Sequence, residues 1–201
     1  MTIIHNAVLS FPHLFQKHKA TATAEPKFSC QLLVRPDNPA VQQIHQAARE
    51  AAIEKFGPEM GPRMPSPLKT GEDINHARAL KGKPPRPELA GLLAITASES
   101  VCLRLAMSDG RSCLNTDTDP ASVQLLGELK AKLRAGVIVN AIFDIYAFKV
   151  PANQGVTAGL RGVQFVTDTG PGVMDLGGAT PLAADAFASV EAPPVDGASL
   201  M

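Results

Sequence analysis

The sequence predicts a mainly β protein, a small β-barrel with an inserted helix. Several short runs alternate between apolar and polar residues, as half-buried strands do, and glycines mark the bends between them. One longer run has the spacing of an amphipathic helix. With 201 residues the chain has the length of one domain, and its 45% apolar residues suffice for a packed core.

The first strand is predicted over Lys27–Val34, because its apolar residues fall on alternate positions. Asn38 and Pro39 then suit an N-cap and a first helical position. The helix that follows is ended by Gly57-Pro58. It presents one apolar row at spacings of four residues, formed by Ile44, Ala48, Ala52 and Phe56.

Residues 57–88 carry seven of the seventeen prolines and are predicted to form a long irregular loop. The second half of this loop, His76–Pro87, holds four cations and no acidic residue. Loops of this length in compact domains are usually functional or disordered. We therefore expect the segment to contact a bound ligand or a neighbouring protomer.

The remaining elements are more strands and a short helix. Alternation predicts strands over residues 93–97 and 101–105, and Asp119-Pro120 opens a helical segment that ends near Leu133. The strongest strand is Val137–Phe148, whose odd positions are all apolar. Its partner is predicted over Val156–Val166, where the alternation slips at Gly162 and indicates a β-bulge.

A zero net charge conceals an uneven distribution along the chain. Residues 1–166 carry 19 basic and 14 acidic groups, and residues 167–201 carry five acids and no base. The sequence predicts a folded domain over 1–166 and a disordered acidic tail rich in Gly, Pro and Ala over 167–201. A basic body with an acidic end is typical of nucleic-acid binding.

The sequence gives no sign of export or of a membrane segment. The three cysteines have no close pairing, which favours reduced thiols and an intracellular location. Motifs of phosphate-binding loops, hydrolases and zinc sites are absent, and no cofactor is predicted. Asp109, Asp117 and Asp119 lie close enough in sequence to bind a divalent ion, although turn and capping roles are the better explanation of them.

Aromatic residues set among cations are the better indication of function. A protein that binds single-stranded nucleic acid needs flat rings to stack on the bases and cations to contact the phosphates. Tyr146 and Phe148 share the more polar face of their strand, and Lys149 follows. The predicted DNA-contacting residues are Tyr146, Phe148, Lys149, Phe15, Lys17, Lys19, Lys27, Arg35, Lys81, Lys83, Arg86, Arg104 and Arg161.

Four segments resemble those of phage-encoded single-stranded DNA-binding proteins. They are Val8–Phe15, Lys27–Val34 with its Pro-led helix, Asn140–Phe148, and Gly155–Gln164. The resemblance implies an OB-fold, a five-stranded barrel, distantly akin to the helix-destabilising proteins of podophages. It also implies coating of exposed strands during phage DNA replication or recombination, in the cytoplasm of the infected bacterium.

The resemblance further implies that Tyr146 and Phe148 line the groove and that an acidic tail recruits replication proteins. The tail of this chain is only mildly acidic and ends in Ser-Leu-Met. Two other functions remain open: a phage structural or assembly β-protein, and a metal-dependent nuclease that uses the three aspartates.

Overall fold

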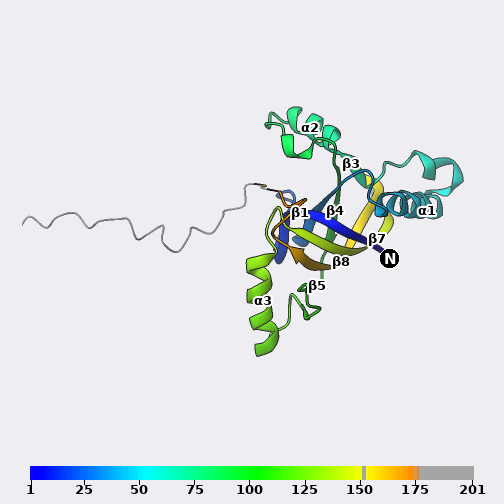
Figure 1. Cartoon of the computed structure of the whole chain (residues 1–201). Coiled ribbons are helices and arrows are strands. Elements are labelled where there is room, and N and C mark those ends of the chain that lie inside the picture. Colours follow the sequence, from blue (N-terminus) through cyan, green and yellow to red (C-terminus); the bar gives the residue numbers. More distant parts are fainter. Residues whose placement is uncertain (151–152, 175, 177–201) are drawn as a thin grey trace, which may run out of the picture.

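The computed structural model describes residues 1–150, 153–174 and 176. Its centre is a closed five-stranded barrel (Figure 1). The barrel strands are β1 (Thr2–His18), β2 (Lys27–Val34), β4 (Leu93–Glu99), β7 (Ile138–Val150) and β8 (Asn153–Thr167). Neighbouring strands are ordered β4-β2-β1-β7-β8, and the parallel pairing of β4 with β8 closes the barrel. The predicted mainly β class and five-stranded barrel are confirmed.

Shorter elements are attached to this barrel. They are α1 (Ala40–Met60), the 3-10 helix η1 (Gly61–Arg63), β3 (Leu68–Thr70), α2 (Gly71–Ala79), the 3-10 helix η2 (Pro87–Leu89), β5 (Arg104–Ala106), β6 (Ser112–Leu114) and α3 (Pro120–Lys132). Strand β3 pairs with β4, and β5 pairs with both β6 and β8. Helices α2 and α3 lie at opposite ends of the molecule (Figure 1).

The core fills the barrel and the space beneath α1. Odd positions of β7, such as Val139 and Phe143, are fully buried, as the alternation predicts. Ile44, Ala48 and Ala52 are buried on α1 and Phe56 is half-buried, so the predicted apolar row is confirmed. The helical backbone breaks at Gly57, whose φ of 81° favours glycine, before one further turn reaches Met60.

The predicted bulge in β8 is present one residue before Gly162. Ile142 pairs with Gly162 and Phe143 pairs with Leu160, which leaves Arg161 without an opposite residue. The bulge turns this arginine outward, where its side chain is exposed.

The expectation of an irregular loop over 57–88 is wrong, because much of this segment is ordered secondary structure. Thr70 and Asp73 form a capping box that starts α2, with the Thr70 Oγ1 accepting from the Asp73 N–H at 3.0 Å. Gly71 fits against the carbonyl of Leu89, where any side chain would clash. We call residues 71–92, which return the chain from β3 to β4, the α2 arm.

The end of the described chain packs on the barrel beyond the boundary expected at residue 166. Lys132 Nζ forms an ion pair with Asp168 Oδ2 at 3.0 Å. Val173, Met174 and Leu176 pack against a second apolar cluster around Leu33 and Leu89. Most of the predicted tail, residues 177–201, lies outside the described residues. Among those that are described, no helix is both long and apolar enough to span a bilayer.

Candidate nucleic-acid interface

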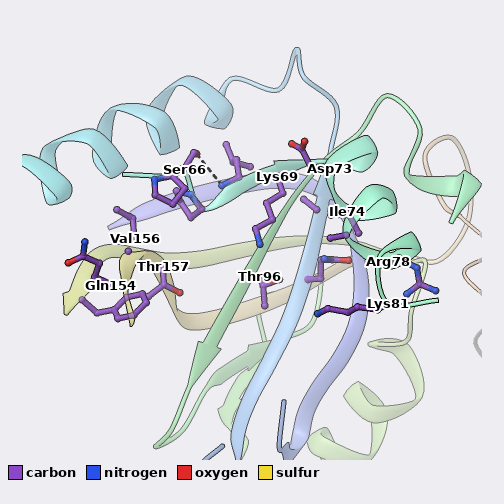
Figure 2. Close-up of a pocket in the computed structure, with 18 of the residues that line it drawn as sticks. Ser66, Lys69, Asp73, Ile74, Arg78, Lys81, Thr96, Gln154, Val156 and Thr157 are labelled. Atoms are coloured by element: carbon purple, nitrogen blue, oxygen red, sulfur yellow. Dashed lines mark hydrogen bonds between the residues drawn. The ribbon is translucent and has the colours of Figure 1, made fainter. Parts of the chain in front are cut away.

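A cavity of about 900 Å³ lies on the outer face of β2 and β4. Gln31, Ala94 and Thr96 form its floor, the α2 arm forms one side, and the β7–β8 hairpin forms the other. Figure 2 shows Lys69 pointing into this space, with Gln154 and Thr157 on the side opposite Arg78 and Lys81. We call this cavity the basic groove.

The floor follows from strand register. Gln31 of β2 stands directly opposite Thr96 of β4, and residues opposite each other in a ladder share a face. Leu32 and Ile95, one position along, point into the barrel and are fully buried. The sheet therefore presents an amide and a hydroxyl outward, above an apolar interior.

Four cations line the groove: Lys69, Arg78, Lys81 and Lys83. The turn after α2 gathers three of them, because Arg78 Nε donates to the Pro84 carbonyl at 2.9 Å and Lys83 N–H donates to the Arg78 carbonyl at 3.0 Å. The one carboxylate in the lining, Asp73, is occupied by the capping box. This arrangement favours an anionic ligand.

The hairpin side of the groove supplies aromatic rings. Phe148 lines the groove, and Tyr146, two residues earlier on the same face of β7, is 43% exposed. Each ring lies over a glycine of β8. A methyl group on Gly155 would lie 3.6 Å from Phe148 Cε1, and one on Gly159 would lie 3.2 Å from Tyr146 Cε1.

The structure brings some of the predicted contact residues together and scatters others. Lys81, Lys83 and Phe148 line the basic groove, with Tyr146 and the exposed Lys149 on the adjoining hairpin. Lys17, Lys19 and Lys27 are exposed around the β1–β2 connection, outside the groove lining. Phe15 is partly buried against the core. Arg35 is exposed beside Asp37, at 3.5 Å.

Two predicted arginines line a different cavity. Arg104 and Arg161 border a space of about 490 Å³ on the outer face of β1, β7, β8 and β5, with Ile3 and Ile142. Arg161 is bound by Asp144 at 2.7 Å and by Glu99 at 3.3 Å. The hydrogen bond from Arg161 holds the pKa of Asp144 below its usual range, so this pair is charged at neutral pH.

Arg86 is 12% exposed, and its guanidinium contacts both the α2 arm and strand β1. Its Nε donates to Glu88 at 2.6 Å, and the guanidinium lies over the Phe11 ring at 4.7 Å. The amide of Asn75 bonds both the N–H and the carbonyl of Arg86. The structure thus places Arg86 as an anchor of the arm, away from the groove lining.

Sequence reasoning missed the floor residues Gln31 and Thr96 and the wall residue Lys69. Gln31 was visible as a polar residue on the outer side of a strand, but only the β2–β4 pairing makes it a groove floor. Lys69 lies in β3, within the segment that was expected to be irregular.

The three aspartates serve local structure. Asp109 accepts from the Arg111 N–H, Asp117 accepts from the Leu114 N–H at 2.8 Å, and Asp119 caps α3 through the Ser122 N–H at 3.0 Å. The cysteines have free thiols, and full burial raises the pKa of Cys30 to about 12.

Comparisons with known proteins agree with this fold. Two solved structures of the single-stranded DNA-binding protein from bacteriophage Enc34 are similar. The complex with ssDNA has a TM-score of 0.65 at 19% identity, covering 84% of this chain and 87% of that chain. A C-terminal truncation has a TM-score of 0.63 at 20% identity, covering 84% and 86%.

No curated protein sequence matches the chain. The family described as "Enterobacter phage Enc34, ssDNA-binding protein" matches residues 1–196. This match confirms the resemblance to phage single-stranded DNA-binding proteins, and the chain belongs to the Enc34 ssDNA-binding protein family.

Proposed function

We propose that this chain binds single-stranded DNA without sequence preference and protects exposed strands during phage DNA replication or recombination, in the cytoplasm of the infected bacterium. The basic groove is the observation that carries the proposal. It lies on the second and third strands of the barrel, beside the connection between the fourth and fifth, which is where OB-folds bind oligonucleotides.

Binding in this groove needs no chemistry on the DNA. The lysines and arginine of the wall neutralise phosphates, and Phe148 and Tyr146 offer ring faces to unpaired bases. A duplex hides its base faces in the stack, so the groove holds the open strand and shifts the melting equilibrium by mass action. Membership of a DNA-binding family supports a role that is not enzymatic.

The other predicted contacts stay predictions. Lys17, Lys19 and Lys27 would extend the phosphate path beyond the groove towards the β1–β2 connection. The predicted tail would contact replication proteins. Neighbouring protomers would associate along the DNA that they coat.

Tyrosine fluorescence offers a direct test. Tyr146 is the single tyrosine and the chain has no tryptophan, so intrinsic emission reports this ring. Titration with an oligo-dT should quench the emission, because a stacked base contacts the ring. The binding constant should fall with salt at a slope of about −0.7 per phosphate neutralised. A chain that binds no oligo-dT at low salt would contradict the proposal and favour a structural protein.

A further inference from the structure

One polar atom in the basic groove lacks a partner. Among the residues that the structure describes, Gln31 Oε1 is the single buried side-chain nitrogen or oxygen without a hydrogen bond. Burying an acceptor without a hydrogen bond is unfavourable, so native proteins rarely keep one without a reason. The amide lines the groove, between the cationic arm and the aromatic hairpin.

The neighbours of Gln31 do not supply the missing donor. Thr96 stands opposite on β4 and Ser10 stands opposite on β1, where the Ser10 Oγ lies 3.5 Å from Arg86 Nη2. Oε1 makes no hydrogen bond within the described residues, and the residue that carries it lines the groove.

The chemistry of DNA restricts what can satisfy this acceptor. Phosphates and deoxyribose within a strand are acceptors only, because DNA lacks the 2′-hydroxyl donor of RNA. Base edges carry the N–H donors of a DNA strand. We propose that Gln31 accepts a hydrogen bond from a base N–H, so that the strand lies with its bases against the floor and its phosphates towards Lys69, Arg78 and Lys81.

This inference rests on the proposed function and adds the orientation of the strand. It predicts a contact with base edges in addition to stacking. The contact does not require one particular sequence, because every base presents at least one N–H on its pairing edge.

Thymine allows a clean test because its only N–H donor is at N3. The parent chain and Gln31→Leu are titrated with oligo-dT and with N3-methylthymidine oligonucleotides of equal length. The parent should bind the methylated strand about three- to tenfold more weakly, the effect of one lost hydrogen bond. Gln31→Leu should bind both strands alike, with the salt dependence of the parent, since no charge has changed.

Lys81→Ala is the matched control. It should weaken both strands equally and reduce the salt slope by about 0.7, because it removes a phosphate contact. Gln31→Leu should unfold no earlier than the parent, because replacing an unpaired buried acceptor by an apolar group of similar shape is neutral or stabilising.

The outcomes separate the inference from the function it rests on. If Gln31→Leu still discriminates between the two strands as the parent does, or weakens both equally, Gln31 is not the base acceptor and the orientation is overturned. If the parent binds neither strand at low salt, the proposed function itself fails.

Discussion

Arg86 lies 4.7 Å above the ring of Phe11, and this contact joins the α2 arm to strand β1. Phe11 has a φ of 46°, a left-handed conformation that is rare for a bulky residue, and its side chain is 51% exposed. The strained residue is thus held under the guanidinium that Glu88 and Ser10 also contact. The α2 arm carries Arg78, Lys81 and Lys83, so we expect the position of these three cations to depend on the Arg86 contact.

Replacing Arg86 by alanine should loosen the arm. We expect a loss of about 1–3 kcal/mol in the free energy of unfolding, because a largely buried cation–π and charge-assisted contact disappears. Urea unfolding measures the loss, and hydrogen exchange should show faster exchange over residues 71–92. Arg86→Lys should restore little of the lost stability, since an ammonium group cannot stack flat on an aromatic ring while it also donates several hydrogen bonds in fixed directions. Arg35→Ala, at an exposed site, should change stability by less than about 0.5 kcal/mol; equal losses in both variants would contradict the anchor.

Tyr146 should contribute through its ring and not through its hydroxyl. Tyr146→Phe is expected to bind oligo-dT like the parent, and Tyr146→Ala should lose about 1–3 kcal/mol of binding free energy. Fluorescence anisotropy of a labelled oligonucleotide measures both variants. The slope of log K against log salt concentration should be the same in both variants as in the parent. A well-folded Tyr146→Ala with unchanged affinity would show that this ring is not part of the interface.

Gly159 should matter because the Tyr146 ring occupies the space above it. In Gly159→Ala the new methyl would lie 3.2 Å from the ring, tighter than ordinary contact, and should displace it. We expect altered tyrosine emission in the free protein and weaker quenching by oligo-dT. Gly127→Ala in α3, where a methyl meets nothing within 4 Å, should leave binding unchanged and stabilise the helix by about 1 kcal/mol. Equal quenching in both variants would show that the glycine does not position the ring.

Removing a cation of the groove should weaken the salt dependence of DNA binding. Alanine at Lys69, Arg78 or Lys83 should each lower the magnitude of the slope of log K against log salt by about 0.7. Lys130→Ala provides the control, because α3 lies at the end of the molecule opposite α2 (Figure 1). A slope that changes as much in Lys130→Ala as in the groove variants would point to non-specific attraction by the whole surface.

The ion pair of Arg161 and Asp144 should make stability depend on acid pH. The folded pKa of Asp144 is depressed, with the hydrogen bond from Arg161 as the largest cause, so its contribution is present above the unfolded pKa of about 3.9 and is lost as pH falls through the folded pKa. Asp144→Asn should therefore be less stable than the parent at pH 7, and the two should converge as the pH falls through the folded pKa of Asp144. Urea midpoints across this range measure the difference; a constant gap would exclude the ion pair as its source.

Much of the barrel could be predicted because local patterns determine it. The alternation in Lys27–Val34 and Val137–Phe148, and the row through Ile44 and Ala48, each record which side of an element is buried. Strand β1 could not be found in this way. Asn6 and Phe11 adopt positive φ, and register shifts interrupt its pairing, so no regular alternation survives in the sequence.

The candidate site was predictable only in part, for a similar reason. Lys81, Lys83 and Phe148 could be proposed from their residue types, but Gln31 gains its role from β4, which is distant in sequence. The nine-residue helix α2 was hidden by the prolines on either side, and its polar composition gives a weak amphipathic signal. Its capping box, Thr70 with Asp73, was the one local sign of it.

The parallel pairing of Ala97 with Ala158 has a consequence for biosynthesis. During translation β4 leaves the ribosome long before its partner β8, and the interval between β1 and its partner β7 is longer still. The nascent barrel therefore keeps open hydrophobic edges until its last strand emerges, and such late, non-local closure is associated with slow folding. Chaperone demand in the host should consequently rise when the phage makes this protein quickly.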